Sequence, residues 1–279
     1  MKYKNLLVHL DHSSGCRNRL QVAFELARKF DAQLLGLFIV PTYIVPSYVE
    51  AQVSTDLLND VTEKALARAR EAADEYAGQA REAGVELQTA VIEGAYIPVL
   101  REHTKYADLL ILGQDNPEDP DNTSYGLADE LLFEGACPCL VVPHSGKPAT
   151  PGKRVLLAWN ASRESARALR EAMPLLESAD SVVALAQEPD GGGRELANEH
   201  PHTDALLKLL ASHGIEARSC GMAELDLDPS EAIIAQAAEM DADVIVMGAY
   251  GHARLREIIL GGVTRDLLKR APTCLLLAH

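Results

Sequence analysis

The sequence predicts an α/β protein built from two tandem, doubly wound parallel-sheet domains, and three observations predict it. Short apolar runs rich in β-branched residues, such as Val244–Met247, alternate with segments whose apolar residues recur every three or four positions. The runs are typical of parallel strands buried on both faces, and the segments are typical of helices that cover them. The second half of the sequence repeats the first. A length of 279 residues suffices for two domains with a core each.

The internal repeat defines the organisation of the chain. The segment Ala107–Gly113 recurs as Ala242–Gly248, and Leu6–Ser13 recurs as Val155–Ser162. The two spacings differ, so the first copy is the longer, and its extra residues lie between its first and fourth strands. The sequence therefore contains two copies of one domain.

A polar stretch rich in glycine, proline and serine separates the two copies. It runs from Ser145 to Gly152 and is typical of a linker. We therefore expect one domain at 1–145 and a second at 153–279.

In the first copy, strands and helices are expected to alternate. A cap near Ser13 or Ser14 starts the first helix, and Gly84 ends a long helix that runs from about Thr55 to Ala83. The expected strands are Asn5–Leu10, Gln33–Val40, Val85–Ile92, Leu109–Leu112 and Leu140–Val142.

The second copy repeats this order. Asp228 is a capping acid followed by proline at the first helical position, which predicts a helix start there. The expected helices are Ser162–Glu177, Thr203–His213 and Asp228–Met240, and the expected strands include Val182–Ala186, Ile215–Ser219 and Leu275–Leu277.

Composition excludes several classes of protein. A net charge of −15 and a pI near 5.0 argue against a nucleic-acid partner, because no basic face offsets the phosphate charge. The longest apolar runs are too short to span a membrane, and no signal peptide is visible. Five cysteines, an odd number, do not indicate a disulfide framework, so we expect a reducing cytoplasm.

Glycines after the strand Val244–Met247 indicate an anion site. Gly248 and Gly251 are separated by two residues, and Gly261 follows nine residues later, just before a helical pattern. A strand, a glycine turn and a helix N-terminus bring backbone N–H groups together, and the helix dipole favours negative charge. Glycine also lets the backbone approach a phosphate closely.

This spacing, with the flanking Asp241–Val246, resembles the G-x2-G-x9-G-[ST] signature of the universal stress protein family. The resemblance covers nearly the whole chain, and it implies a Rossmann-like fold of the adenine nucleotide alpha hydrolase type. The ATP-binding branch carries Ser or Thr directly after the third glycine, but this chain has Gly262. The substitution removes a hydroxyl expected to hold a terminal phosphate.

The resemblance also places a residue at the end of the first strand against the nucleotide. An aspartate commonly contacts the adenosine part there, and the second copy has Asn160 instead, which keeps an amide but no charge. His252 lies in the glycine loop, and its side chain can be positively charged and so contact a phosphate. The candidate nucleotide-binding residues are Asn160, Met247, Gly248, Gly251, His252, Gly261, Gly262, Val263 and Thr264.

The first copy has lost part of the glycine motif. Asn116 replaces the second glycine, and Leu127 follows Gly126. Carboxylates at Glu118, Asp119 and Asp121 stand where a phosphate would have to lie. We expect this half to be a structural partner with a degenerate motif.

Other patterns suggest catalysis or metal binding less specifically. His9, Asp11, His12 and Cys16 are close in sequence, but no second pair follows at zinc-like spacing, and packing or capping explains them better. Cys137 and Cys139 are spaced C-x-C, which does not match a C-x-x-C redox motif. Ser162 lacks the G-x-S-x-G context of a hydrolase nucleophile.

Taken with the resemblance, these observations predict a cytoplasmic stress-response protein that binds ATP or AMP in its second copy, with magnesium accompanying ATP. The alternative is a regulatory scaffold that binds no ATP, or a binder of another small ligand. No catalytic or metal-ligating residues are predicted, so turnover is limited to a weak ATPase at most. The family pairs protomers through last strands, which implies Leu140–Val142 antiparallel to Leu275–Leu277 in an intramolecular pseudo-dimer. A homodimer is compatible with it.

Overall fold

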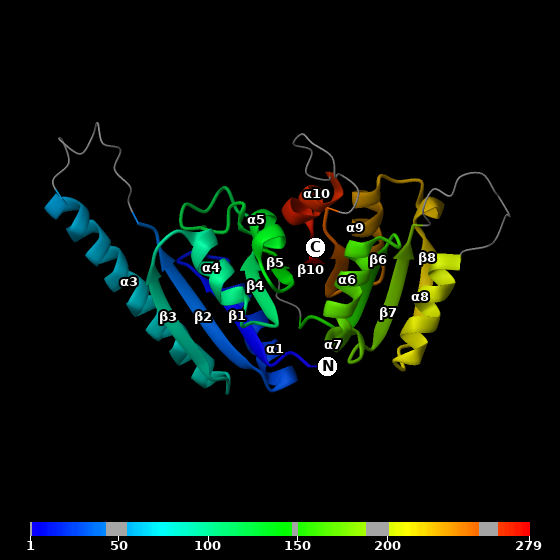
Figure 1. The fold of residues 1–279 in the computed structure, drawn as a ribbon, viewed down its shortest axis with the longest axis horizontal. Coiled ribbons are helices and arrows are strands. Elements are labelled where there is room, and N and C mark those ends of the chain that lie inside the picture. Colours follow the sequence, from blue (N-terminus) through cyan, green and yellow to red (C-terminus); the bar gives the residue numbers. More distant parts are fainter. Residues whose placement is uncertain (1, 43–54, 147–149, 188–200, 251–261) are drawn as a thin grey trace. The chain divides into compact units, whose positions relative to one another are not determined.

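The computed structural model describes residues 2–42, 55–146, 150–187, 201–250 and 262–279. The chain forms two compact units, which we call the N-terminal unit (residues 3–137) and the C-terminal unit (residues 138–279 together with the first two residues). In each unit parallel strands are covered by helices (Figure 1). The predicted α/β class with doubly wound parallel sheets is confirmed. No helix in these ranges has the length and hydropathy that a membrane crossing requires.

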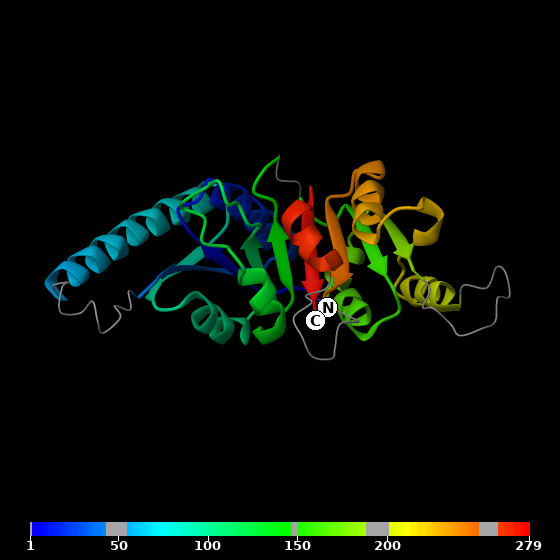
Figure 2. The same ribbon diagram turned by 90° about the horizontal axis from the view of Figure 1, so that it is seen from above.

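The N-terminal unit has four parallel strands in the order β3-β2-β1-β4. Figure 2 shows α1 and α3 on one face of this sheet and α4 and α5 on the other. The elements are β1 (Asn5–Leu10), α1 (Cys16–Phe30), β2 (Gln33–Val40), α3 (Thr55–Glu82), β3 (Leu87–Glu93), α4 (Tyr96–Thr104), β4 (Leu109–Gly113) and α5 (Leu127–Glu134).

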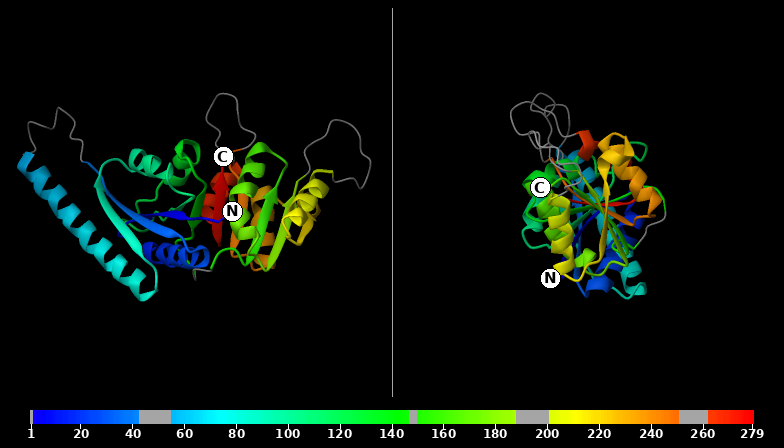
Figure 3. Two further views of the ribbon diagram at one scale, coloured as in Figure 1. Left: turned by 60° about the horizontal axis from the view of Figure 1, so that its bottom comes forward. Right: turned by 90° about the vertical axis from the view of Figure 1, so that its right-hand side faces the viewer.

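The C-terminal unit has the strand order β5-β10-β9-β6-β7-β8. Seen from the β8 edge, α8 and α9 lie on opposite sides of the strands (Figure 3). The elements are β5 (Cys139–Val142), β6 (Arg154–Trp159), α6 (Arg163–Glu171), α7 (Met173–Leu176), β7 (Ser181–Ala186), α8 (Pro201–Ser212), β8 (Ala217–Gly221), the 3₁₀ helix η1 (Met222–Leu225), α9 (Pro229–Glu239), β9 (Val244–Gly248), α10 (Gly262–Arg270) and β10 (Cys274–Ala278).

Strand β5 comes from the first repeat but pairs with the last strand of the second. Leu140 lies opposite Leu276 in an antiparallel ladder, while β10 runs parallel to β9 on its other side. The predicted antiparallel pairing of these two strands is confirmed. All residues of β5 and β10 are buried, and each fully buried leucine contributes about 1.5–3 kcal/mol to folding.

Two expected strands begin later than predicted, for one physical reason. Gly84 and Gly214 have positive φ angles of 72° and 75°, and the next N–H, of Val85 or Ile215, bonds back to a carbonyl five residues earlier. These bonds close helices α3 and α8, so β3 and β8 start only at Leu87 and Ala217.

The helix expected over Ser162–Glu177 is divided into α6 and α7. Pro174 lies in the first turn of α7, where its missing N–H costs nothing, but it cannot continue the hydrogen-bond ladder of α6. The start of α6 is as predicted, since the Ser162 hydroxyl accepts a hydrogen bond from the Ser165 N–H at 3.1 Å.

An aspartate before the fourth strand of each repeat ties that strand to the first one. Asp243 is buried, and its two carboxylate oxygens accept hydrogen bonds from the backbone N–H groups of Gly152, Lys153 and Arg154 at 2.7–3.1 Å. Asp108 uses a single oxygen for the N–H groups of Lys4 and Asn5. The aspartate therefore clamps the amino end of the first strand in each unit.

We expect Asp243→Asn to destabilise the protein by about 1–3 kcal/mol, because the new NH2 group would face backbone N–H donors in a buried place. The matched variant Asp108→Asn should cost less, since its amide oxygen can still accept both bonds. Urea unfolding followed by circular dichroism measures both. Equal losses in the two variants would contradict this assignment.

Candidate functional site

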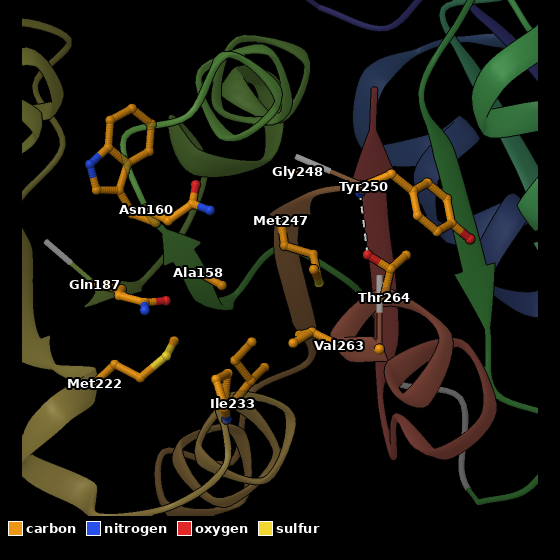
Figure 4. A pocket seen from close by; sticks show the side chains of 13 residues that line it. Ala158, Asn160, Gln187, Met222, Ile233, Met247, Gly248, Tyr250, Val263 and Thr264 are labelled. Carbon is orange, nitrogen blue, oxygen red and sulfur yellow. Dashed lines mark hydrogen bonds between the residues drawn. The ribbon is translucent and has the colours of Figure 1, made fainter. Parts of the chain in front are cut away.

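The main candidate site is a cavity of about 410 Å³ at the carboxyl edge of the C-terminal sheet. Ligands of doubly wound sheets bind at this edge. Asn160, Gln187 and Met222 surround one end of the cavity, and Val263 and Thr264 lie at the other (Figure 4). The lining residues are Ala158, Trp159, Asn160, Gln187, Met222, Pro229, Ile233, Met247, Gly248, Tyr250, Gly262, Val263 and Thr264.

Most of the predicted site residues meet in this cavity. The residues that line it are Asn160, Met247, Gly248, Gly262, Val263 and Thr264. Gly251, His252 and Gly261 lie outside the described residues. Residues separated by about a hundred positions in sequence thus come together, because β6 and β9 are neighbours in the sheet.

The structure gives Gly248 a different role from the predicted approach to a phosphate. A Cβ on Gly248 would lie 2.4 Å from the backbone carbonyl carbon of Glu164 and the backbone nitrogen of Ser165. Glycine is therefore required by the close packing of α6 on the end of β9. Gly262 differs, because a Cβ there would lie more than 4 Å from every neighbouring atom of the residues that the structure describes.

The two polar groups of the Asn160 side chain have different roles, since the oxygen holds a turn and the NH2 group does not. Its Oδ1 accepts a hydrogen bond from the Ser162 N–H at 3.2 Å, which fixes the turn between β6 and α6. A backbone N–H needs an acceptor, so the oxygen must face Ser162 and the NH2 group is left over. Within the described chain neither this NH2 group nor the Gln187 amide has a hydrogen-bond partner.

The opposite end of the cavity is formed by the start of α10. The first N–H groups of a helix lack intrahelical acceptors and carry partial positive charge. The Thr264 hydroxyl oxygen lies in this first turn and accepts from the Tyr250 N–H at 3.4 Å (Figure 4). None of the described lining residues is charged, so the helix end, amides and hydroxyls supply the polar character of the cavity.

Gln187, Met222 and Ile233 line the cavity but were not among the residues predicted from the sequence. Gln187 is the first polar residue after β7, so the rule that sites lie beyond strand carboxyl ends could have identified it. Met222 and Ile233 sit in helical turns η1 and α9, and no local sequence signal marks them.

The equivalent edge of the N-terminal unit is filled by the protein itself. Asp11, at the place of Asn160 in the repeat, accepts bonds from the Ser13 N–H at 3.1 Å and hydroxyl at 2.6 Å. The same oxygen forms a buried ion pair with Arg19 at 2.8 Å, and Thr123 donates to the other oxygen at 3.2 Å. A cavity of about 160 Å³ remains beside them.

Arg19 accounts for much of this difference between the units. Its Nη1 bonds to the Ser124 hydroxyl at 3.3 Å and would lie 2.3 Å from a Cβ on Gly113. The repeat places Ala168 where Arg19 stands, and Ala168 has no side chain to extend over β9. The guanidinium therefore packs on the end of β4, whereas the backbone of α6 packs on the equivalent end of β9.

Asp119 occupies the first turn before α1. Its carboxylate accepts from the Ser14 N–H at 2.8 Å and hydroxyl at 2.7 Å, and these bonds lower its pKa. It is one of the carboxylates predicted to oppose a phosphate. The observed contacts show a carboxylate using backbone N–H donors that an anionic ligand would otherwise need.

Four residues close in sequence, His9, Asp11, His12 and Cys16, lie at the turn between β1 and α1. His12 stacks on Phe38 with ring centroids 4.8 Å apart, and the Cys16 thiol is buried in the first turn of α1. Among the residues that the structure describes, no three His, Cys, Asp or Glu side chains are grouped as a metal site. All five cysteines are free thiols.

Burial controls the ionisation of His9 and Asp11. Burial and the nearby Arg19 charge lower the pKa of His9 to about 3, although Asp11 acts in the opposite direction. Burial alone would raise the pKa of Asp11, but Arg19, His9 and the hydrogen bonds from Ser13 and Arg19 lower it to about 2. At neutral pH His9 is neutral and Asp11 is charged.

We expect His9 to make the N-terminal unit sensitive to acid. Because the folded pKa lies below the unfolded value of 6.5, the unfolded state binds more protons between pH 6.5 and 3, and stability falls as pH decreases through that window. The loss between pH 7 and 4.5 should be about 2–3 kcal/mol. Urea unfolding of wild type and His9→Gln at both pH values tests this, and equal losses in the two proteins would contradict it.

Comparison with known proteins agrees with this architecture. The universal stress protein family model matches residues 2–143 and again 152–279. A universal stress protein of Methanocaldococcus jannaschii is 25% identical over 146 residues, which are 50% of this chain and 82% of that protein.

Two solved structures are similar over nearly the whole chain. A universal stress protein from Archaeoglobus fulgidus has a TM-score of 0.73 and 17% identity, with 98% of this chain and 95% of that chain covered. A putative universal stress protein from Pseudomonas aeruginosa has a TM-score of 0.58 and 17% identity, with 99% and 93% covered. The chain belongs to the universal stress protein family, whose model it matches twice.

Proposed function

We propose that this protein binds an adenine nucleotide, ATP or AMP, in the cavity of its C-terminal unit, and that it acts as a cytoplasmic regulator in stress adaptation. One observation supports this most strongly. The cavity joins an apolar wall and the side-chain amides of Asn160 and Gln187, which have no partner among the described residues, to the first turn of α10 at the other end. An apolar pocket with a few convergent polar groups and an anion-binding helix end suits a nucleotide. Five free thiols fit a reducing compartment.

The order of the strands suggests how the nucleotide lies. The phosphates would lie at the N-terminus of α10, next to β9, where backbone N–H groups and the Thr264 hydroxyl can bind them. The adenine would lie at the far end, beyond β6, against Met222 and Ile233. The Gln187 amide can there bond to the edge of the base.

The described lining supports binding more than turnover. It contains no carboxylate and no histidine to act as a general base, so the proposal limits hydrolysis to a weak activity at most. Magnesium would accompany ATP through the phosphate oxygens, since magnesium commonly relies on substrate phosphates.

The proposal assigns no nucleotide to the N-terminal unit. Arg19 covers the end of β4, and Asp11 and Asp119 already use the donors of the turn before α1. This unit would then act as the structural half of an intramolecular pseudo-dimer.

Gly262 and Asn160 favour a second candidate function, a regulatory scaffold that binds no ATP. The ATP-binding branch of the family carries Ser or Thr where this chain has Gly262, and the family commonly has Asp where this chain has Asn160. A helix N-terminus keeps its backbone donors without either side chain, so we place nucleotide binding first.

We expect AMP and ATP to bind the purified protein, with magnesium affecting only ATP. Trp159 is the sole tryptophan and lines the cavity, so its fluorescence should change on binding, with calorimetry as an independent measurement. A control with Trp159→Phe should lose the optical signal and keep the heat. No binding at millimolar nucleotide would refute the proposal and favour the scaffold.

The open space at Gly262 predicts a gain of function. We expect Gly262→Ser to fold normally and to bind ATP about 2–10 times more tightly, since one added hydrogen bond is worth about 0.5–1.5 kcal/mol. The control Gly262→Ala adds the same Cβ without a hydroxyl and should show no such gain. An equal gain in both variants would mean that helix stability, and not the hydroxyl, is responsible.

A further inference from the structure

The residue that ends the first strand makes the same hydrogen bond to the turn in both units. Its remaining atoms differ, since they are a charged carboxylate oxygen in one unit and a neutral NH2 group in the other. Asp11 and Asn160 each accept the N–H two residues later, at 3.1 and 3.2 Å. Asp11 has a negative charge, which Arg19 neutralises. Among the described residues that line its cavity Asn160 has no such cation, since Ala168 stands in the place of Arg19, and its remaining NH2 group can only donate.

At the end of the cavity that Asn160 shares with Gln187 and Met222, the strand order places Asn160 nearer to α10 than Gln187. From the α10 end, the strands that follow are β9, β6, β7 and β8, spaced about 4.8 Å apart. A nucleotide with its phosphates at α10 and its base near Gln187 would extend over these strands. The group between phosphate and base is the ribose, and it would lie over β6 beside Asn160.

We infer that Asn160 selects for a ribose that carries an added phosphate, so that the preferred ligand is an adenosine bisphosphate in which the 2′ or 3′ position is phosphorylated as well as the 5′ position. This inference rests on the proposed nucleotide function. The Asn160 NH2 group can donate to a phosphate oxygen as well as to a ribose hydroxyl, whereas a carboxylate in its place would accept from ribose hydroxyls and repel a phosphate.

The charges around the two sites agree with this selection. In a chain of net charge −15, the described lining of the C-terminal cavity contains no carboxylate. The lining of the smaller cavity in the N-terminal unit contains the carboxylates Asp11 and Asp121 together with one cation, Arg68. Only the C-terminal cavity therefore lets a second anionic group approach the first-strand residue without a neighbouring negative charge from that lining.

The test compares wild type with Asn160→Asp. Asp11 shows that a carboxylate supports the same turn, so this variant should keep the fold. The probes are AMP, adenosine 3′,5′-bisphosphate and adenosine 2′,5′-bisphosphate, titrated by calorimetry. Wild type should bind at least one bisphosphate more tightly than AMP. In Asn160→Asp that bisphosphate should weaken on the order of tenfold relative to AMP, through charge repulsion.

A second variant separates a local effect from a general one. Gln187→Glu places the same charge at the base end of the cavity, and it should weaken AMP and the bisphosphates to a similar extent. An unchanged ratio in Asn160→Asp, or wild type that binds neither bisphosphate more tightly than AMP, would overturn the inference alone. Wild type that binds none of the three probes would refute the proposed function as well.

Discussion

Both units depend on one hydrogen bond at the end of their first strand. In each, a side-chain oxygen accepts a hydrogen bond from the backbone N–H two residues later. Asp11 accepts from Ser13, and Asn160 accepts from Ser162. This bond turns the chain from the strand into the helix that follows, and so sets where α1 and α6 lie on the sheet. The turn also brings α6 close to Gly248. A Cβ added at Gly248 would lie 2.4 Å from the backbone of α6. The edge of the sheet where ligands bind is built outward from this turn.

The remaining side-chain atoms of that residue, in Asp11 or Asn160, influence whether the carboxyl edge of the sheet is filled by protein side chains or keeps a cavity. A buried carboxylate needs a cation, and Asp11 has Arg19, whose side chain crosses the end of β4 to reach it. Removing one member of such a pair costs about 3–5 kcal/mol, so the two residues must be kept or lost together. An amide carries no such requirement. Asn160 with Ala168 leaves a cavity of about 410 Å³, where Asp11 with Arg19 leaves about 160 Å³.

The sequence predicted those features that depend on local pattern. Strand positions follow from apolar runs, and the pairing of β5 with β10 follows from the repeat and the family resemblance. Predictions failed where one residue serves two elements. Val85 and Ile215 look like strand residues, but their N–H groups close the preceding helices. The burial of Arg19 could not be predicted, because its partners Asp11 and Ser124 come together only in the folded sheet.

In each unit the aspartate that holds the first strand and the candidate binding site lie at opposite edges of the sheet, and this separation lets the two copies diverge. Asp108 and Asp243 hold the amino ends of β1 and β6, and they do so in both units, whatever the chemistry at the other edge. Strand β5, which pairs with β10, buries a further row of apolar residues. A change at the carboxyl edge therefore alters what the edge can bind while the clamp at the amino edge stays intact. One copy can fill its own site with Arg19 and Asp119, and the other can keep an open one, on the same framework.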